Sequence, residues 1–237
     1  MRGVIASASE ARILDITHQF PRGDIRTSAF WLREILPWFP PSVHLVVVDP
    51  GVGTDRDILV IDAGGHHLVG PDNGVLLPAA RELDSDATHY RLSAYDAASA
   101  TFHGRDVFAP LAARIHDWTG TIAAIPELEP TDDAEAIAFP APTVTSNEAR
   151  GEVLVIDHFG NVITNIPGSF LTPYLGQTVD VNGIPTPAVQ TYGEVGRGEA
   201  LVTVGSHGQI ELAVRDGRGA VAFDVSKTAP IQINVDA

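Results

Sequence analysis

The pattern of hydrophobic segments changes abruptly after about residue 120, and this change constrains the fold more than any other feature of the 237-residue chain. Before it, short apolar runs alternate with segments of helical periodicity. The run Val43–Val48 is continuously apolar apart from His44, as is typical of a buried parallel strand. The alternation predicts an α/β unit with a mostly parallel sheet.

The expected elements of this first part are read from apolar periodicity and from capping or breaking residues. The predicted strands are Ile13–Thr17, Val43–Val48, Ile58–Ile61 and His67–Gly70. The predicted helices are Thr27–Leu36 after an Asp24 N-cap, Gly74–Leu83 after an Asp72 or Asn73 cap, and Asp106–Ile115 with Asp106 as cap.

Beyond residue 120 the chain first becomes proline-rich and acidic, and then contains only strand-like runs separated by glycines. We expect three parts: an α/β domain over 1–120, a linker over 121–148 and a small antiparallel β-barrel-like domain over 149–237. The strands expected in the last part are Gly151–Ile156, Thr178–Val181, Ala200–Val204, Gln209–Val214 and Ile231–Val235.

Charge and composition exclude several functions. The formal net charge of −15 argues against a nucleic-acid partner, which would require basic density. The absence of cysteine excludes disulfides and thiolate chemistry. Lys227 is the only lysine, and an acidic, lysine-poor surface is halophile-like, although GC-rich coding would have the same effect. No apolar segment is long enough to span a membrane, so we expect a cytoplasmic protein.

The strongest candidate site follows the run Val43–Val48, where Asp49 is succeeded by a glycine-rich turn and then by Arg56. Ligands of open α/β sheets bind beyond the carboxyl ends of strands, and Arg56 is close enough in sequence to fold back onto Asp49. The alternative interpretation is an Asx-Pro turn with a surface arginine.

Four further segments carry candidate residues, each with a plainer alternative. The Asn73 amide is suited to reading a ligand, or only caps a helix. His103, beside Gly104, is placed to act as a general acid or base or to orient water. The alternative is that His103 is a structural residue. Phe159 and Asn161 offer a stacking face and an amide suited to a purine, or form a turn with an aromatic plug. The turn at Ser206 reads equally as a simple hairpin.

Five motifs in a fixed order together resemble one family, the S-adenosyl-L-methionine (SAM) hydroxide adenosyltransferases, or SAM hydrolases, which are related to fluorinase and chlorinase. They are Val-Val-Val-Asp-Pro-Gly-Val-Gly-Thr at 46–54, Pro-Asp-Asn-Gly at 71–74, Thr-Phe-His-Gly-Arg-Asp-x-Phe-Ala-Pro at 101–110, Ile-Asp-x-Phe-Gly-Asn-x-x-Thr-Asn-Ile at 156–166 and Gly-Ser-x-Gly-x-x-Glu at 205–211.

The resemblance implies an N-terminal α/β domain, a C-terminal β-domain and a homotrimer with sites between subunits. It also implies hydrolysis of SAM to adenosine and methionine by water or hydroxide attack at the ribose C5′, without metal or other cofactor. The physical logic is that a sulfonium is already a good leaving group, so the enzyme mainly desolvates and positions water.

Residue by residue, the family's water-activating set falls on Asp49, Arg56 and His103. The halogenating relatives lack this set, and one of them has serine at the position of Gly104, so the resemblance favours water over halide. The substrate-binding positions implied for this chain are Asn73, Phe102, Asp157, Phe159, Asn161, Ser206 and His207. Of these, Phe159 and Asn161 match adenine contacts, Asp157 and Ser206 match methionine contacts, and His207 replaces an arginine of fluorinase.

The chain departs from the family at Met1, because relatives carry about 20 earlier residues that form a strand and a turn with a ribose-binding aspartate. This departure leads us to expect weak substrate binding and a sheet short of one strand. With its N-terminal segment missing, the chain could instead be an adenosine- or SAM-binding protein without catalysis. A separate alternative to a hydrolase is a SAM-dependent halogenase.

Overall fold

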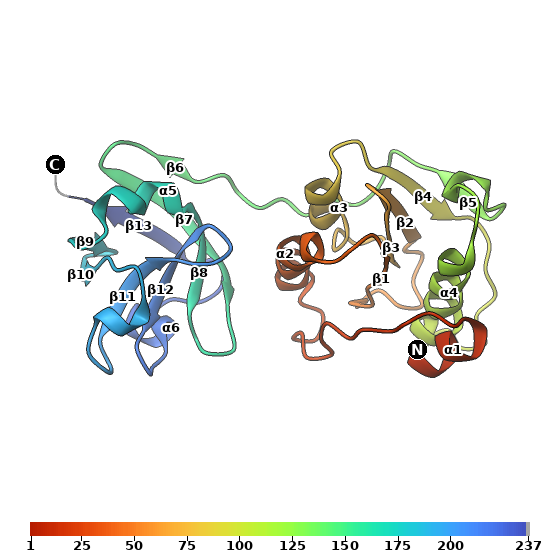
Figure 1. Cartoon of the computed structure of the whole chain (residues 1–237), viewed down its shortest axis with the longest axis horizontal. Helices are drawn as coiled ribbons and strands as arrows, with labels where there is room; N and C mark the ends of the chain where they lie inside the picture. The colour runs from red at the N-terminus through yellow and green to blue at the C-terminus, as the bar shows by residue number, and fades with distance from the viewer. Residues whose placement is uncertain (236–237) are drawn as a thin grey trace. The chain divides into compact units, whose positions relative to one another are not determined.

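The computed structural model describes residues 1–235 and divides into two compact units, residues 1–137 and 138–237 (Figure 1). Each unit has its own hydrophobic core. The segment expected as a linker contributes a short strand to each unit, β5 (Leu128–Pro130) to the first and β6 (Thr143–Val144) to the second.

The first unit contains a five-stranded sheet in the order β1-β3-β2-β4-β5. The strands other than β5 are β1 (Val43–Leu45), β2 (Ile58–Ala63), β3 (His66–Pro71) and β4 (Thr88–Leu92). Only β1 and β3 pair in parallel, whereas β2 pairs antiparallel with β3 and β4, and β4 antiparallel with β5.

The predicted mostly parallel sheet is therefore wrong, and the reason lies in one turn. Gly64 and Gly65 both have positive φ, at 59° and 85°, and they alone connect β2 to β3. A two-residue turn of this kind closes a hairpin, and a hairpin forces antiparallel pairing. A parallel connection would need a crossover of a dozen or more residues.

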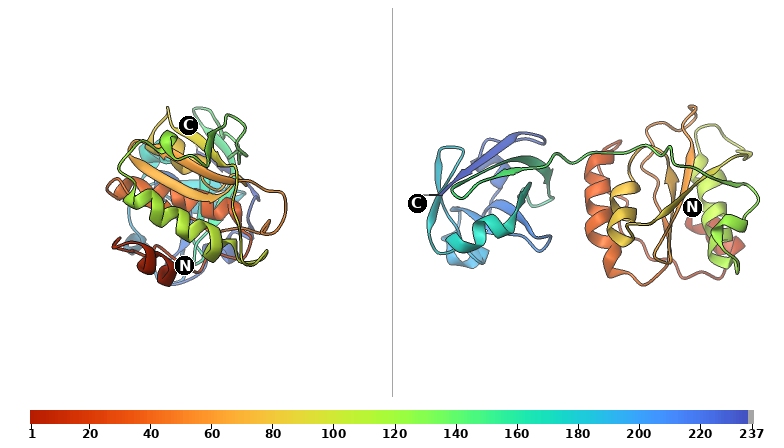
Figure 2. Two further views of the ribbon diagram at one scale, coloured as in Figure 1. Left: turned by 90° about the vertical axis from the view of Figure 1, so that its right-hand side faces the viewer. Right: turned by 90° about the horizontal axis from the view of Figure 1, so that it is seen from above.

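Helices cover both faces of this sheet, which makes three layers (Figure 2, right). They are α1 (Arg2–Ala8), α2 (Ile25–Ile35), α3 (Leu77–Leu83) and α4 (Ala109–Asp117), with short helical turns at η1 (Leu36–Trp38), η2 (Gly104–Phe108) and η3 (Ile122–Ala124). The helices α2 and α3 lie on one face. The helix α4 lies on the other and packs apolar side chains such as Leu111 and Ile115 against the sheet core.

The sequence predicted some of these boundaries and missed others. Asp24 caps α2, accepting a hydrogen bond from the Thr27 N–H at 3.1 Å, as expected. Ile13–Thr17 forms no strand, and the strand predicted to reach Val48 ends at Leu45. Asp106 caps no helix, since it lies within the π-helical turn η2 and accepts from the Ser99 N–H at 2.9 Å.

The second unit is an eight-stranded antiparallel sheet in the order β10-β9-β13-β7-β8-β12-β11, with β6 beside β7. The strands other than β6 are β7 (Glu148–Ile156), β8 (Val162–Pro167), β9 (Thr178–Val181), β10 (Ile184–Pro187), β11 (Ala200–Val204), β12 (Gln209–Val214) and β13 (Pro230–Asn234). Its helical turns are α5 (Gly168–Leu171), η4 (Thr172–Tyr174), η5 (Tyr192–Glu194) and α6 (Gly219–Ala222).

The two ends of this sheet approach each other, because an isolated parallel bridge joins Ala188 to Val202 of β11 just beyond β10. The sheet is thus nearly closed, and its interior holds a core of small and branched side chains including Val153, Ile166 and Leu212. The antiparallel barrel-like prediction is confirmed. The strands β6, β8 and β10 were not predicted from the sequence.

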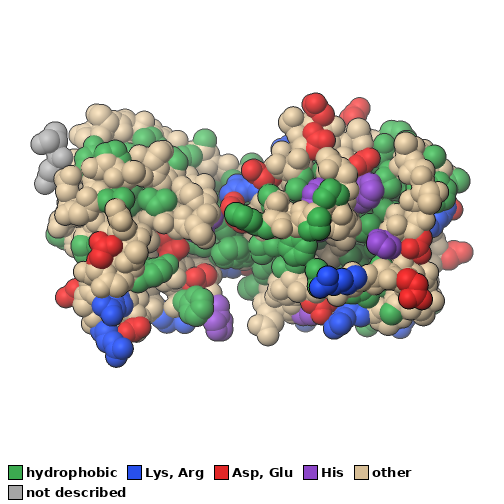
Figure 3. All heavy atoms as spheres, in the orientation of Figure 1, with side chains coloured by type: hydrophobic (Ala, Val, Ile, Leu, Met, Phe, Trp, Pro, Cys, Tyr) green, Lys and Arg blue, Asp and Glu red, His purple; other side chains and the backbone are tan. Residues whose placement is uncertain are grey.

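Among the described residues no helix combines the length and the apolarity needed to cross a membrane. Arginine side chains appear in small separate groups on the face shown in Figure 3, interspersed with acidic ones. This face therefore carries no continuous basic patch of the kind that binds nucleic acid.

Candidate active site

The central feature of the first unit is a buried ion pair between Asp49 and Arg56, extended to a histidine. Arg56 Nε donates to Asp49 Oδ1 at 3.0 Å and Arg56 Nη2 donates to Asp49 Oδ2 at 2.5 Å. The same Nη2 donates to His103 Nδ1 at 3.0 Å. The two side chains of the ion pair are 4% and 8% exposed, and His103 is buried. Burial and the two-pronged geometry make this pair rigid.

The loop after Asp49 folds back because its glycines allow a close approach. Gly53 has a φ of +79°, and a Cβ at that position would lie 2.8 Å from the carbonyl oxygen of Ala100. The loop therefore packs directly against the segment that leads into His103. The Cζ atom of the Arg56 guanidinium lies 5.1 Å from the centroid of the Phe108 ring. This contact holds the arginine against the hydrophobic core.

The hydrogen bonds define which atoms remain available for chemistry. A guanidinium only donates, so His103 Nδ1 must accept and the neutral imidazole carries its proton on Nε2. Arg56 Nη1 is buried and has no hydrogen-bond partner among the described residues. The set therefore offers a carboxylate that accepts and two N–H groups that donate.

Asn73 anchors the residue that precedes Asp49. Its Nδ2 donates to the carbonyl oxygen of Val48 at 2.9 Å, and its Oδ1 accepts from the Val75 N–H at 3.3 Å. The helix α3 begins only at Leu77, so neither Asn73 nor Asp72 caps it. Asp72 instead accepts from the Glu135 N–H at 2.8 Å, and its burial raises the pKa of its carboxyl group.

Two features border the set. Phe102 is 57% exposed and stacks under the Arg105 guanidinium at 4.8 Å, while Arg105 itself pairs with the carboxylate of Asp106. A cavity of about 750 Å³ lies beside β1 and residues 11–18, and Asp49 is the only member of the buried set that lines it. This volume is within the range of small-molecule sites.

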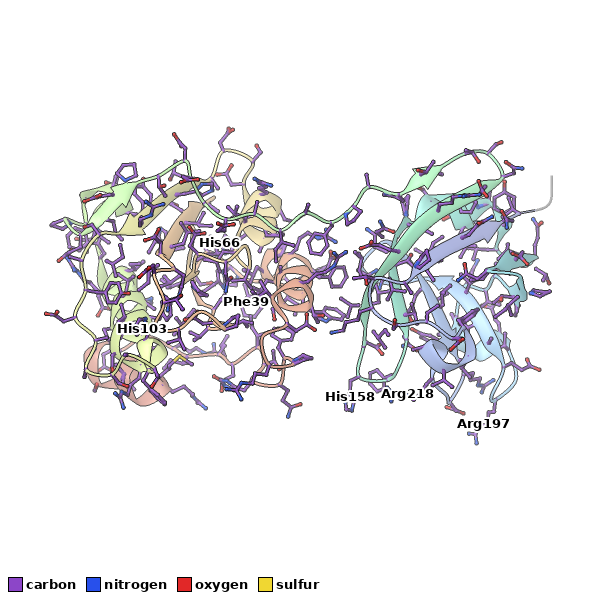
Figure 4. The ribbon with its side chains drawn as sticks, turned by 180° about the vertical axis from the view of Figure 1, so that it is seen from behind. Phe39, His66, His103, His158, Arg197 and Arg218 are labelled. Carbon is purple, nitrogen blue, oxygen red and sulfur yellow. The ribbon has the colours of Figure 1, made fainter. Side chains whose placement is uncertain are left out.

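In the second unit, the turn between β7 and β8 carries three of the predicted residues. Asp157 Oδ1 accepts from the Asn161 N–H at 2.8 Å, and its Oδ2 accepts from Asn161 Nδ2 at 3.1 Å. Phe159 stands at the tip of the turn and is 74% exposed. Gly160 has a φ of +91° and packs against the Arg218 side chain. Figure 4 shows Arg218 next to His158, which belongs to the same turn as Gly160.

The turn between β11 and β12 carries Ser206, which is exposed, and His207, whose side chain is 6% exposed. His207 Nδ1 accepts from the Gln209 N–H at 3.2 Å, and its Nε2 lies 3.6 Å from Glu211 Oε2. The other oxygen of Glu211 accepts a hydrogen bond from the Tyr192 hydroxyl. Burial, and then this bond, raise the pKa of Tyr192, so the phenol keeps its proton.

The sequence reading had not selected Tyr192 and Glu211 as site residues. Glu211 is the last residue of the motif at 205–211, which was a usable signal. For Tyr192 the sequence carried only a capping box, in which Thr191 and Glu194 fix the turn η5, and this box does not indicate the contact with Glu211.

A buried histidine pair lies apart from these sets. His44 Nε2 and His66 Nδ1 are 2.8 Å apart, with rings stacked at 5.1 Å, and Figure 4 labels His66 in the first unit. Burial, helped by the charges of His66 and His67, lowers the pKa of His44 to about 4. Among the residues that the structure describes, no group of three or more histidine, aspartate or glutamate side chains is arranged to hold a metal ion.

The structure thus brings Asp49, Arg56 and His103 together in one unit, and Asp157 and Asn161 together in the other. The protein thus combines a three-layer unit that holds a buried acid–arginine–histidine set with an antiparallel barrel whose β7–β8 and β11–β12 turns expose polar and aromatic side chains. This combination is that of a two-domain enzyme.

Comparison with known proteins identifies the family. The SAM hydroxide adenosyltransferase N-terminal domain matches residues 1–125, and the corresponding C-terminal domain matches residues 151–232. The chain belongs to the SAM hydroxide adenosyltransferase family.

Relatives and solved structures support this assignment. An (R)-S-adenosyl-L-methionine hydrolase of Salinispora tropica is 44% identical over 94% of this chain and 87% of its own length. An (R)-S-adenosyl-L-methionine hydrolase of Thermus thermophilus is 36% identical over 93% of this chain and 87% of its own length. The crystal structure of an uncharacterized conserved protein from Thermotoga maritima has a TM-score of 0.88 at 33% identity, covering 99% of this chain and 93% of that one.

Proposed function

We propose that this protein hydrolyses S-adenosyl-L-methionine to adenosine and L-methionine. The family, and relatives of that name at up to 44% identity over most of the chain, support the reaction. The observation that carries it is the buried Asp49–Arg56–His103 set, which combines a carboxylate acceptor with N–H donors of the kind that orient a water molecule.

In this reaction a water oxygen forms a bond to the ribose C5′ as the C5′–S bond breaks. The bonding electron pair goes to the sulfonium, which leaves as the neutral thioether of methionine, and the water loses a proton. The Asp49 carboxylate accepts a hydrogen bond from the attacking water and draws off its proton. Arg56 Nη1 and His103 Nε2 donate, so they fix the direction of the oxygen lone pair.

The barrel residues take the substrate-binding roles. The exposed Phe159 ring provides a face for the adenine, and Asn161 reads its polar edge. Ser206, His207 and Asp157 contact the amino-acid part of SAM. Asn73 holds the carbonyl group of Val48, next to Asp49, and Phe102 lines the approach to the ribose.

A homotrimer with sites between subunits is part of the proposal, and the family resemblance supports it. Water is preferred over halide because the acid–arginine–histidine set is complete. A serine at Gly104, as in one halogenating relative, would be crowded here, since a Cβ would lie 3.3 Å from Val47 Cγ1.

The test is chromatography of the products formed from SAM by the wild-type protein and by two variants. Asp49→Asn removes the acceptor charge and is expected to lower kcat by at least about 100-fold. Asp55→Asn is the matched control, because Asp55 is exposed in the same loop and outside the set. Absence of adenosine and methionine with the wild-type protein, or normal turnover by Asp49→Asn, would contradict the proposal.

A further inference from the structure

The turn that joins β7 to β8 is closed by hydrogen bonds at both of its ends. The Asp157 N–H donates to the Asn161 carbonyl oxygen at 3.0 Å, and the Gly160 N–H donates to the Asp157 carbonyl oxygen at 3.1 Å. Together with the two side-chain bonds from Asn161 to Asp157, these bonds fix the first and last residues of the turn relative to each other.

The chemistry of the two side chains fixes how the Asn161 amide is turned. An ionised carboxylate accepts hydrogen bonds and has none to donate. Only the –NH₂ end of the Asn161 amide can therefore face Asp157 Oδ2, and reversing the amide would place two acceptors 3.1 Å apart. Within residues 1–235 no hydrogen bond reaches Asn161 Oδ1, which is left for a ligand.

We propose that Asp157 is a positioning residue that locks the Asn161 amide with its carbonyl oxygen toward the base, so that the site selects a purine bearing an amine at C6. This inference rests on the proposed function, because it takes Asn161 to be the residue that reads the base. Asp157 acts on the base through Asn161: each of its carboxylate oxygens accepts one hydrogen bond from that residue and keeps a lone pair for the amino group of the substrate.

The discrimination follows from the direction of one hydrogen bond. The exocyclic amine of adenine donates to Asn161 Oδ1, whereas the 6-oxo group of hypoxanthine would set an acceptor against an acceptor. Phe159, two residues earlier in the turn, stacks equally well on either base, so it contributes affinity without selection. A locked amide is expected to favour adenosine over inosine by at least about 10-fold.

The test measures the affinities of adenosine and inosine by calorimetry on the wild-type protein and on variants of Asp157. Asp157→Asn can face either end of the Asn161 amide, and Asp157→Ser can donate or accept through its hydroxyl. Both variants release the lock, and the adenosine-to-inosine affinity ratio is expected to fall to within about 3-fold of unity. His158→Ala, at an exposed position of the same turn, is the matched control and keeps the wild-type ratio.

Each outcome has a distinct meaning. Equal affinity of the wild-type protein for the two nucleosides overturns this inference alone, as does a variant that binds adenosine but keeps the full ratio. Failure of the wild-type protein to bind adenosine at all overturns the proposed function and this inference with it. If Asp157 had a purely structural role, its substitution would weaken the binding of both nucleosides equally and leave the affinity ratio unchanged. That result would also contradict the inference.

Discussion

Arg56 determines the chemistry of the buried set at the scale of single residues. It donates to both oxygens of Asp49 and to His103 Nδ1, and these bonds leave no lone pair on the neutral imidazole for a proton from water. In the proposed reaction the acceptor for that proton is therefore Asp49, and the histidine acts by donating. The pairing of Arg56 with Asp49 could be predicted from their spacing, but the tautomer of His103 could not, because it depends on a contact across 47 residues.

The buried His44–His66 pair makes the first unit sensitive to acid. Because burial lowers the pKa of His44 to about 4 while the unfolded chain keeps the ordinary value near 6.5, the unfolded state binds more protons between these values. The stability contributed by the neutral histidine is complete above pH 6.5. It is lost as pH falls toward 4, by on the order of 3 kcal/mol at most.

Urea unfolding at pH 7.5 and at pH 4.5 checks this prediction. His44→Gln keeps a side chain that can hydrogen-bond to His66 and is expected to show a smaller difference between the two pH values than the wild-type protein. The exposed His116→Gln serves as control and should retain the wild-type difference. An unchanged difference in His44→Gln would show that the pair is not the acid-sensitive group.

At the scale of elements, the conformation of the loop from Asp49 to Arg56 depends on Gly53. An alanine there would adopt a φ of +79° and place its Cβ 2.8 Å from the Ala100 carbonyl oxygen. Gly53→Ala is expected to destabilise the unit by about 2–4 kcal/mol and to lower kcat, because the loop must move away from His103.

Gly23→Ala is the matched comparison for this loop. Gly23 also has positive φ, at +72°, but its nearest neighbour would be Pro50 Cβ at an ordinary 3.7 Å. It should lose about 1 kcal/mol in thermal or urea unfolding and keep its turnover. If the two variants behave alike, the close approach to Ala100 does not shape the site.

Most strands of the barrel could be predicted from the sequence, whereas the pairing of strands in the first sheet could not. In the barrel, alternating apolar residues between glycines mark strands whose neighbours in sequence are antiparallel, so local pattern and topology agree. In the first unit, buried apolar runs indicate strands but not their direction. The direction was available only from the two-residue Gly64–Gly65 turn, which indicates a hairpin.

At the scale of the whole molecule, the change in the pattern of hydrophobic segments after residue 120 predicted two domains. The structure divides into two compact units at residue 137. The intervening segment looked irregular because its strands β5 and β6 are short and acquire order only by pairing with β4 and β7. The set around Asp49 and the set around Asn161 were both foreseeable as loop motifs. Tyr192 was not, because its role arises from a contact with Glu211 that no local pattern encodes.

The proposed trimer with sites between subunits predicts complementation. Asp49→Asn and Asn161→Ala are each expected to be nearly inactive alone. Co-expressed in equal amounts, they should regain about a quarter of wild-type activity, because that share of subunit pairs joins an intact Asp49 to an intact Asn161. Steady-state assays of the mixture check this, and a mixture no more active than its parents would place each site within a single chain.

The most direct test of the central claim is hydrolysis of SAM in water enriched in oxygen-18, with mass spectrometry of both products. Attack of water at C5′ predicts one labelled oxygen in adenosine, at its 5′-hydroxyl, and none in methionine. Unlabelled adenosine, label in the amino-acid product, or no cleavage of SAM would contradict the account.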